Sequence, residues 1–327
     1  MNYQQCVWFR ELSRQDVPLA GGKGANLGDM VQAGLPIPPG FVIVAPAYRE
    51  IVECGGLDVQ ILSILDSLDR NDCAQLREVE DLIREMFVTC LIPDDMQACI
   101  LESYRALGDN VAVAVRSSAT AEDLAGASFA GQQETMLNVV GETALMHAVR
   151  RCFSSLFTSQ AIFYRRQRGF CDAEVSMAVV VQRMIESEKS GVVFTVDPVM
   201  RNRYNMIIEG VWGLGEGIVS GTITPDHYKI DRETYEIVYE FVPEKRIMIC
   251  RNADQGVQTL PVPEDRVSAR VLSEPELHQL VGGKAVEVDR SAPFNRYKLR
   301  HLHGYDVAAV PAVGDADVLG VAGYRVG

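Results

Sequence analysis

The sequence predicts an α+β fold of mixed α/β character, with two lobes around a cleft. Three observations lead to this prediction. The 327 residues fit two domains at roughly 150 residues per domain. The N-terminal third carries apolar side chains three and four positions apart, a spacing typical of helices. In the second half, short β-branched runs separated by turn residues predict strands and hairpins.

The composition is that of an ordinary globular protein, with 47% hydrophobic and 23% charged residues. It excludes disorder, collagen and coiled coil as descriptions of the whole chain. No apolar run reaches the roughly 18 residues that a spanning helix needs, and the first residues do not form a signal peptide. We therefore expect a cytoplasmic protein without a membrane partner.

The formal net charge of −13 argues against a surface that binds nucleic acid or anionic lipid. No nucleic-acid partner is expected, and any phosphate site has to be a local basic pocket. The eight cysteines include no C-x-x-C pair and no Cys/His cluster with zinc spacing. We expect reduced, mostly buried thiols.

Residues 1–110 are predicted to form an α-rich N-terminal lobe. Helices are expected over 24–33, 57–68, 75–87 and 94–107. A strand is expected over 111–115, where β-branched residues alternate after a turn. This strand would end by presenting Arg116 and the two serines after it to a loop.

Residues 111–290 are predicted to form the second lobe, with a mixed sheet. A long amphipathic helix is expected over 142–167, with Arg165 among the arginines on its polar side. Extended segments are expected over 176–185, 191–196, 205–211 and 227–242, the last as a hairpin. The remaining residues, 291–327, are rich in Gly, Ala and Val, and they predict either a poorly packed tail or a loosely determined strand pair.

A glycine cluster around Lys23 runs directly into the first predicted helix. Glycines let backbone approach a ligand, a helix N-terminus supplies oriented N–H groups, and a lysine adds a positive charge, so the segment suits a phosphate. It is not a Walker A loop, because Gly24 replaces the required Ser or Thr and Val17 stands at the upstream glycine position. The alternative is a glycine-rich helix start with a solvated lysine.

Arg116 and the small-residue segment around Gly131 form a second candidate anion site. An arginine at a strand end offers a planar fork to phosphate oxygens, and the loop could cover a triphosphate with its backbone N–H groups. The alternative for Arg116 is a salt bridge to Glu122 or Asp123. For Gly131 it is an ordinary hairpin turn.

The strand ending at Gln182 could border an adenine ring, with Met184 packing against the ring, although a core strand is an equal alternative. A Gly-rich loop at 213–217 fails as a dinucleotide fingerprint, because Ile218 occupies the third glycine position. A structural turn explains this loop better. Glu209 and Glu216 could nevertheless face a cleft and hold Mg²⁺.

Five motifs in order carry a family resemblance: GGKGANLGDM with GLPIPPGFVI, AVRSSATAEDLAGASFAGQQETMLNV, VVVQRMI, SGVVFTVDP and WGLGEGIVSG with TPDHYKID. Over about residues 9–285, the chain resembles the N-terminal nucleotide-binding region of the phosphoenolpyruvate synthase and pyruvate phosphate dikinase family, which includes rifampin phosphotransferase. The resemblance implies an ATP-grasp fold with ATP and Mg²⁺ between two lobes. It implies ATP contacts at Lys23, Arg116, Gly131, Thr135 and Gln182.

The resemblance further implies an ATP-dependent phosphotransferase. Lys23 and Arg116 would be catalytic by neutralising phosphate charge, Thr135 would bond a phosphate oxygen, and Gln182 would border the adenine. The phosphoryl group would pass to a histidine of another domain, and then to pyruvate or another small acceptor such as an antibiotic.

Two family features are missing from the sequence. After about residue 288 there is no D-I-E-W-like glutamate and no Q-S-R-P-like run, so the metal ligands stay unassigned, and no histidine stands in a T-x-G-G-x-x-S-H-like run. A phosphohistidine domain or subunit would therefore act in trans if the chain is a fragment, a subunit or a standalone variant. The alternative is a catalytically incomplete nucleotide-binding regulatory or partner subunit. An acyl-phosphate ligase fits the motifs less well.

Overall fold

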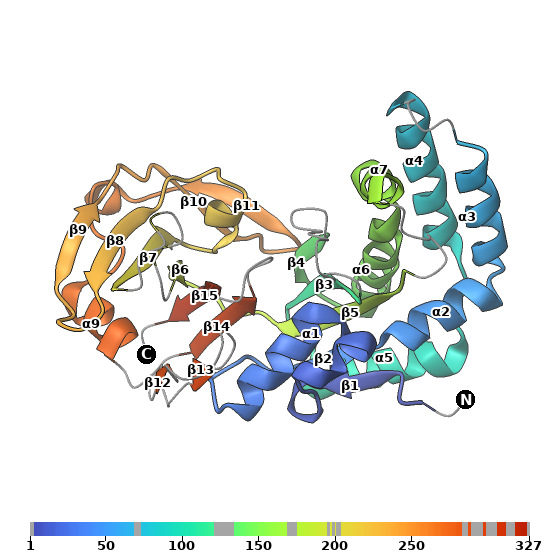
Figure 1. The fold of residues 1–327 in the computed structure, drawn as a ribbon, viewed down its shortest axis with the longest axis horizontal. Coiled ribbons are helices and arrows are strands. Elements are labelled where there is room, and N and C mark those ends of the chain that lie inside the picture. The colour runs from blue at the N-terminus through green and yellow to red at the C-terminus, as the bar shows by residue number, and fades with distance from the viewer. Residues whose placement is uncertain are drawn as a thin grey trace. The chain divides into compact units, whose positions relative to one another are not determined.

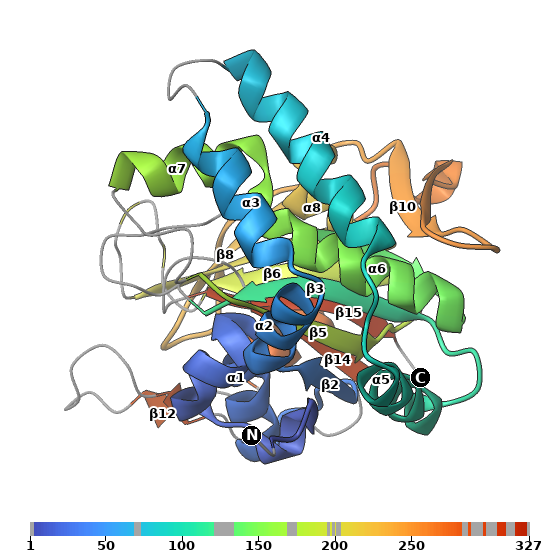
Figure 2. The same cartoon turned by 90° about the vertical axis from the view of Figure 1, so that its right-hand side faces the viewer.

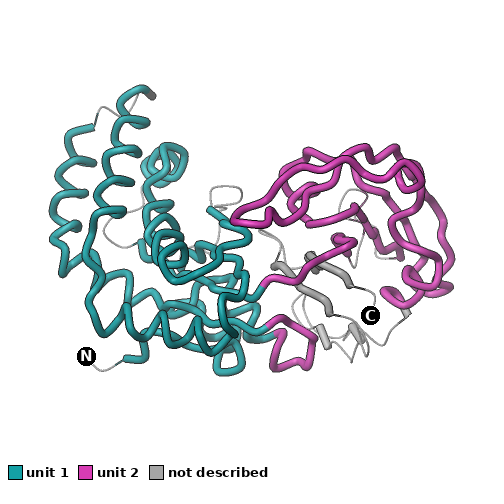
Figure 3. Tube along the Cα trace, turned by 180° about the vertical axis from the view of Figure 1, so that it is seen from behind, with its two compact units in different colours: residues 1–29, 39–183 teal, residues 30–38, 184–327 magenta. Residues whose placement is uncertain are grey.

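The computed structural model describes most of the chain as two compact units. It covers residues 3–68, 73–120, 134–168, 175–194, 197, 200 and 204–282, with the strand segments 287–288, 297–298, 306–311 and 318–325. Unit 1 comprises residues 1–29 and 39–183, and unit 2 comprises residues 30–38 and 184–327 (Figure 3). The mixture of helices and sheets agrees with the predicted α+β class. No helix in the described ranges has the length and apolarity to cross a membrane.

Unit 1 combines a five-stranded antiparallel sheet with helices on its faces (Figure 1). The sheet has the order β1-β2-β5-β3-β4. Its strands are β1 (Cys6–Trp8), β2 (Gly40–Ile43), β3 (Val113–Ala119), β4 (Thr135–Val139) and β5 (Met177–Arg183). The helices are α1 (Val17–Gln32), which continues into unit 2, α2 (Ala45–Cys54), α3 (Leu57–Asp66), α4 (Cys73–Thr89), α5 (Asp94–Leu107), α6 (Glu142–Ser154) and α7 (Ser159–Arg168).

An aromatic core joins the helices of unit 1 that follow the second strand. Tyr48 of α2 lies 5.4 Å, centroid to centroid, from Phe153 of α6 and 6.2 Å from Phe87 of α4. Phe87 in turn stacks with Phe157 at 6.0 Å. Such ring pairs contribute about 0.5–1.5 kcal/mol beyond the area that they bury. Figure 2 shows α2, α4 and α6 together over the sheet that these helices cover.

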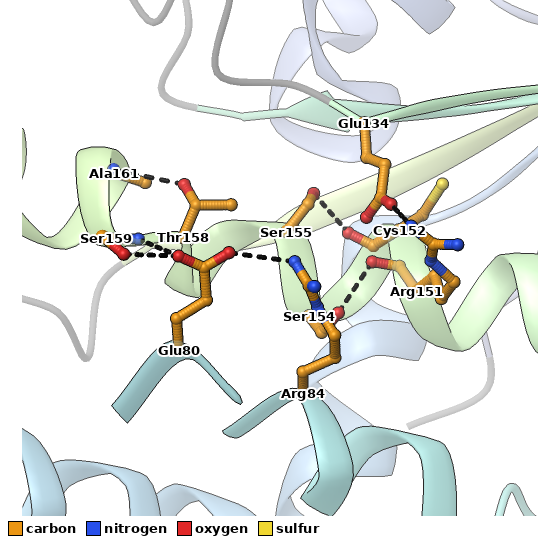
Figure 4. Close-up of polar contacts among 10 residues, drawn as sticks. All are labelled: Glu80, Arg84, Glu134, Arg151, Cys152, Ser154, Ser155, Thr158, Ser159 and Ala161. Atoms are coloured by element: carbon orange, nitrogen blue, oxygen red, sulfur yellow. Dashed lines mark hydrogen bonds and ion pairs between the residues drawn. The ribbon is translucent and has the colours of Figure 1, made fainter. Parts of the chain in front are cut away.

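The predicted helix over 142–167 is in fact two helices separated by a 3₁₀ turn, Ser155–Phe157. The hydroxyls of Ser154 and Ser155 donate to the carbonyls of Arg151 and Cys152, which ends α6 (Figure 4). Thr158 is extended, and its hydroxyl accepts from Ala161 N at 3.2 Å at the start of α7. Apolar periodicity alone could not reveal this break, because serine and threonine caps interrupt it locally.

The prediction that Arg165 lies on a polar helix side is wrong. Its side chain is 1% exposed, donates to the carbonyl of Leu156, and places its guanidinium carbon 5.6 Å from the ring centroid of Phe157. The break between α6 and α7 causes this arrangement, since it turns α7 so that Arg165 reaches back to a carbonyl of the preceding turn.

The prediction that the strand stops before Arg116 also needs correction. β3 continues from Val113 to Ala119, and every residue of it pairs with β5. Ser117 N donates to the carbonyl of Glu134 at 3.1 Å, just before β4. The backbone after Arg116 is therefore bonded to a neighbouring segment and does not form a loop. Arg116 therefore lies inside a buried strand, where its backbone is held on both sides.

Unit 2 contains a six-stranded antiparallel sheet of order β14-β15-β6-β7-β8-β9, and two two-stranded sheets. Its strands are β6 (Lys189–Phe194), β7 (Asn205–Trp212), β8 (Asp226–Asp231), β9 (Ile237–Phe241), β10 (Ile247–Arg251), β11 (Val257–Pro261), β12 (Glu287–Val288), β13 (Tyr297–Lys298), β14 (Asp306–Pro311) and β15 (Val318–Arg325). Its helices are α8 (Glu216–Val219) and α9 (Glu274–Gly282). Of the two interpretations of the C-terminal tail, the structure has the strand pair. β14 pairs with β15, and β15 also pairs with β6.

The division into units differs from the predicted lobes. The expected boundary near residue 110 falls within unit 1, because β3 pairs with β5 in the same sheet as β2.

Each unit holds one tryptophan against a positive charge. Trp8 packs edge-on against Phe41 at 5.8 Å between centroids, with the Arg10 guanidinium over its ring. Lys189 Nζ lies 5.8 Å and the Arg266 guanidinium carbon 5.1 Å from the centroid of the Trp212 ring.

Candidate functional site

The glycine cluster of α1 packs against β3 by direct backbone contact. Gly21 has φ of 67° inside the helix, and a Cβ placed there would lie 2.2 Å from the hydroxyl oxygen of Ser118. That hydroxyl donates to the Ala20 carbonyl at 2.9 Å and accepts from Gly24 N at 3.4 Å, so it bridges the kink. Gly21 and Gly24 thus have a packing role. The sequence analysis assigned these glycines only to the approach of a ligand.

Lys23 follows this kink directly and is buried, with 8% of its surface exposed. The alternative of a solvated lysine is therefore wrong. Its charge acts on Cys152 of α6: burial raises the pKa of the Cys152 thiol, the carboxylate of Glu134 raises it further, and the positive charges of Arg151 and Lys23 oppose the rise. A buried ammonium of this kind favours an anionic neighbour.

The strand register places three of the predicted residues on one face of the sheet. Arg116 pairs directly with Thr135 of β4 on one side and with Val180 of β5 on the other. Gln182 stands two positions beyond Val180, so it shares that face. The same face meets α1, because Val42 pairs with Val180 and lies 3.0 Å from a Cβ placed at Gly24.

The exposure of these side chains falls toward the centre of the sheet. Gln182 is 3% exposed and Arg116 is 8% exposed, whereas Thr135, on the edge strand β4, is exposed. Arg116 interacts with other groups of the protein, but its Nε and Nη1 are buried without a hydrogen-bond acceptor in the described part of the chain. A charged fork beside an exposed hydroxyl at a sheet edge can receive an anion.

Sequence reasoning missed an ion pair that, like Lys23, acts on the Cys152 thiol. Glu134 precedes β4, and its carboxylate pairs with the guanidinium of Arg151 on α6 (Figure 4). Glu134 lies inside a motif that the sequence analysis singled out, and Arg151 follows another arginine on the predicted helix. Their pairing spans two elements that only the fold brings together, so no spacing in the sequence could signal it.

The remaining predicted residues lie elsewhere. Gly131, Glu122 and Asp123 fall outside the described residues. Met184 belongs to unit 2, where it packs against the cluster of Val211, Leu214, Ile223 and Ile249.

The two candidate magnesium ligands lie in unit 2. Glu209 Oε1 lies 3.2 Å from His227 Nδ1, and Glu216 begins the short helix α8. In the turn before it, Gly213 has φ of 78°. Within the described ranges, no group of three or more His, Cys, Asp or Glu side chains is arranged to hold a metal ion.

Comparison with known proteins places this arrangement in a family. The model of the family described as pyruvate phosphate dikinase, AMP/ATP-binding domain, matches residues 17–289. The chain belongs to this family. The pyruvate phosphate dikinase AMP/ATP-binding match contains Lys23, Arg116, Thr135 and Gln182, and it ends near residue 288, where the expected family motifs are missing.

Several relatives of the chain are named as phosphoenolpyruvate synthases. A probable phosphoenolpyruvate synthase of Methanocaldococcus jannaschii is 46% identical over 279 residues, which cover 84% of the chain and 24% of the relative. That of Archaeoglobus fulgidus is 47% identical, with 84% and 37% covered. The phosphoenolpyruvate synthase of Pyrococcus furiosus is 41% identical over 299 residues, with 80% and 37% covered. The chain thus spans well under half the length of these relatives.

Proposed function

We propose that the protein binds Mg·ATP through unit 1, as the nucleotide-binding part of a phosphotransferase of the phosphoenolpyruvate synthase type. The observation that supports this proposal most directly is that Arg116, Thr135 and Gln182 share one face of the sheet, which also meets the helix of the buried Lys23. These residues come from a helix and three strands, and all lie within the family match. We further propose that the fold is of the ATP-grasp type, which the family implies.

In this proposal each residue has a separate task. Lys23 supplies a point charge and Arg116 a planar fork, and together they neutralise the phosphates. Thr135 bonds a phosphate oxygen from the exposed edge strand, and Gln182 borders the adenine. Gly131 covers the phosphates. Positioning and charge neutralisation account for most of the catalysis in phosphoryl transfer, so fixed charges suit this chemistry.

The Glu134–Arg151 pair supports the same site electrostatically. Arg151 acts on the same thiol, Cys152, as Lys23, and Glu134 holds it through an ion pair across two elements. We propose that this pair adds no net charge to the site before a nucleotide enters, because the carboxylate balances the guanidinium. Both side chains are partly exposed, 38% for Arg151 and 19% for Glu134, so solvent also screens their charges.

Mg²⁺ enters this proposal bound to the nucleotide. Mg²⁺ in nucleotide sites keeps several waters and is held by phosphate oxygens with one or two carboxylates. The described residues offer no ready cluster of three ligands, so no protein ligand is assigned. Charge from the metal would assist Lys23 and Arg116 in neutralising the phosphates.

The reaction proposed for the whole enzyme transfers a phosphoryl group from ATP to a histidine, and from there to pyruvate or another small acceptor. The names of the relatives support pyruvate as the acceptor. The 327 residues contain no T-x-G-G-x-x-S-H-like run, so in this proposal the histidine belongs to a phosphohistidine domain outside them.

A second candidate is a nucleotide-binding regulatory or partner subunit without turnover. The observation that favours it is the sequence after residue 288, which contains neither a D-I-E-W-like glutamate nor a Q-S-R-P-like run. Addition of a phosphohistidine domain separates the candidates. Phosphorylation of its histidine from ATP supports the enzyme, whereas ATP binding without such transfer supports the subunit.

Calorimetric titration of Mg·ATP tests the proposed site. We expect the wild-type protein to bind and Arg116→Ala to bind about 10- to 100-fold more weakly, because a charge-assisted hydrogen bond is worth about 1.5–3 kcal/mol. Arg105→Ala is the matched control, since Arg105 is an exposed arginine of unit 1 that forms a surface ion pair with Glu142.

We expect the control variant to bind like the wild type. Equal affinities of the Arg116 and Arg105 variants, with both folded, would contradict the assignment of Arg116. Absence of any binding or thermal stabilisation of the wild type at millimolar nucleotide would contradict the proposed function, because a ligand of the native state must stabilise it.

A further inference from the structure

Two cysteines meet where the first strand of unit 1 packs against α5. Cys6 lies in β1 and is 4% exposed, and Cys99 lies on α5 and is partly exposed. The neighbouring Gln5 donates through Nε2 to Asp95 of α5 at 3.3 Å, which fixes the strand to the helix one turn before Cys99. Figure 1 shows α5 beside β1, and the two elements are in contact.

The two thiols are hydrogen-bonded to each other. Cys6 bonds both Cys99 and Ser103, which stand four positions apart on one face of α5. The hydrogen bond from Cys6 lowers the pKa of the Cys99 thiol to about 7, against the opposing effects of burial and of the carboxylates of Glu102 and Asp95. The same bond, followed by burial, raises the pKa of Cys6. Cys99 is thus the more acidic thiol of the pair, and Cys6 is the less acidic one.

Other described cysteines have a different environment. Burial raises the pKa of Cys90, Cys152 and Cys250. Cys54 is exposed. Partial exposure, a lowered thiol pKa and an adjacent second thiol occur together at Cys99, which is the combination found at redox-sensitive cysteines.

We propose that Cys6 and Cys99 form a reversible disulfide when the protein reacts with a peroxide. This modification site lies at the edge of the unit 1 sheet and is separate from the proposed nucleotide site. A disulfide there would join β1 covalently to α5, which the native fold already holds together.

The chemistry balances in two steps. The Cys99 thiolate attacks hydrogen peroxide, the O–O bond breaks, and the products are Cys99 sulfenic acid and hydroxide. The Cys6 thiol then attacks the sulfenic sulfur, the S–O bond breaks, and the proton of Cys6 leaves with the hydroxyl group as water. The two sulfurs lose two electrons in total, and peroxide accepts them. A dithiol reductant reverses the change.

The test uses the full chain, first reduced and then treated with equimolar hydrogen peroxide at pH 7. Free thiols are blocked with iodoacetamide, and peptides are mapped without reduction. We expect a cross-linked peptide pair containing Cys6 and Cys99, which dithiothreitol converts to two free thiols. Recovery of Cys6 and Cys99 as blocked thiols, while Cys54 is oxidised, would overturn the proposal.

Two serine variants test the assigned roles. In Cys6→Ser, Cys99 should stop at sulfenic acid and react with dimedone, and in Cys99→Ser, Cys6 should stay reduced. Cys54→Ser is the control and should form the cross-link as the wild type does. Persistence of Cys6 oxidation in Cys99→Ser would overturn the order of attack. Mapping of the wild-type protein needs no variant, so a folding defect in either serine variant leaves the proposal testable.

Discussion

Gly21 differs from the other left-handed glycines of unit 1 in what surrounds its Cα. Both Gly21 and Gly56 have φ near +60°, but a Cβ at Gly56 would meet nothing within 4 Å, whereas at Gly21 it would collide with Ser118. Gly21 also has ψ of 171°, a conformation almost restricted to glycine, whereas Gly56 has ψ of 23°, so both backbone strain and steric overlap are greater at Gly21. A side chain at Gly21 would push α1 away from β3 and displace Lys23 with it.

We expect Gly21→Ala to reduce the free energy of unfolding by about 2–4 kcal/mol, since backbone strain and overpacking both act there. Gly56→Ala should cost only about 1 kcal/mol, from strain alone. Urea unfolding monitored by circular dichroism measures both values. Equal losses in the two variants would show that the contact with Ser118 carries no steric constraint.

Arg165 is buried and stabilises the fold, although the sequence of its helix suggests a solvated side chain. We expect Arg165→Ala to lower the free energy of unfolding by about 2–4 kcal/mol, because the Leu156 carbonyl loses its charged donor and Phe157 loses a packed neighbour. Arg246→Ala is the control, because the Arg246 side chain is 76% exposed. A Tm for Arg165→Ala equal to that of the control would be inconsistent with this role.

At the scale of elements, α4 holds the start of α7 through one carboxylate. Glu80 accepts from the backbone N–H of Ser159 at 2.8 Å and from the Ser159 hydroxyl, and it also pairs with Arg84 (Figure 4). An acceptor at a helix N-terminus satisfies a backbone donor that the helix itself leaves unbonded. The acceptor here comes from a different helix, so it couples the two elements.

We expect Glu80→Ala to destabilise the protein by about 1–3 kcal/mol and to speed amide hydrogen exchange selectively in α7. Glu78→Ala, at an exposed position of the same helix, should leave both properties close to the wild type. If exchange in α7 is equally slow in both variants, the cap from α4 is not what holds this helix.

The sequence predicts elements well where one local pattern determines them. α5 has the expected bounds, 94–107, because its apolar residues follow helical spacing between a proline and a glycine. The break before α7 combines local serine and threonine caps with a bond to Glu80, which lies 79 positions away from Ser159 and outside any local pattern. The same reason applies at the candidate site. Lys23 and Arg116 stand in recognisable motifs, whereas the pairing of Glu134 with Arg151 requires the fold.

At the scale of the whole molecule, the chain matches only part of its relatives. It covers 24% of the Methanocaldococcus jannaschii relative and 37% of the Pyrococcus furiosus relative. The proposed nucleotide binding needs charges and hydrogen bonds within unit 1, whereas in-line transfer also needs metals that stay fixed as charge moves to the leaving group. The two proposed activities can therefore be tested separately.

We expect the purified chain to bind Mg·ATP but to release phosphate or AMP slowly or not at all by itself. The tail after residue 290 offers only Asp306, Asp315 and Asp317 as acids, and none stands in a family metal motif. Release is measured at saturating Mg·ATP, with Lys23→Ala as the control for contaminating ATPase. Turnover of about 1–100 s⁻¹ that this variant abolishes would show that other carboxylates hold the metal.

Because each unit contains one tryptophan, intrinsic fluorescence can report on the two units separately. Trp8 lies in unit 1 and Trp212 in unit 2, each in a different polar setting. Indole emission depends on its surroundings, so a Trp212→Phe variant would emit from unit 1 alone and a Trp8→Phe variant from unit 2 alone. Fluorescence during denaturant titration of each variant would then follow one unit at a time, without any attached dye.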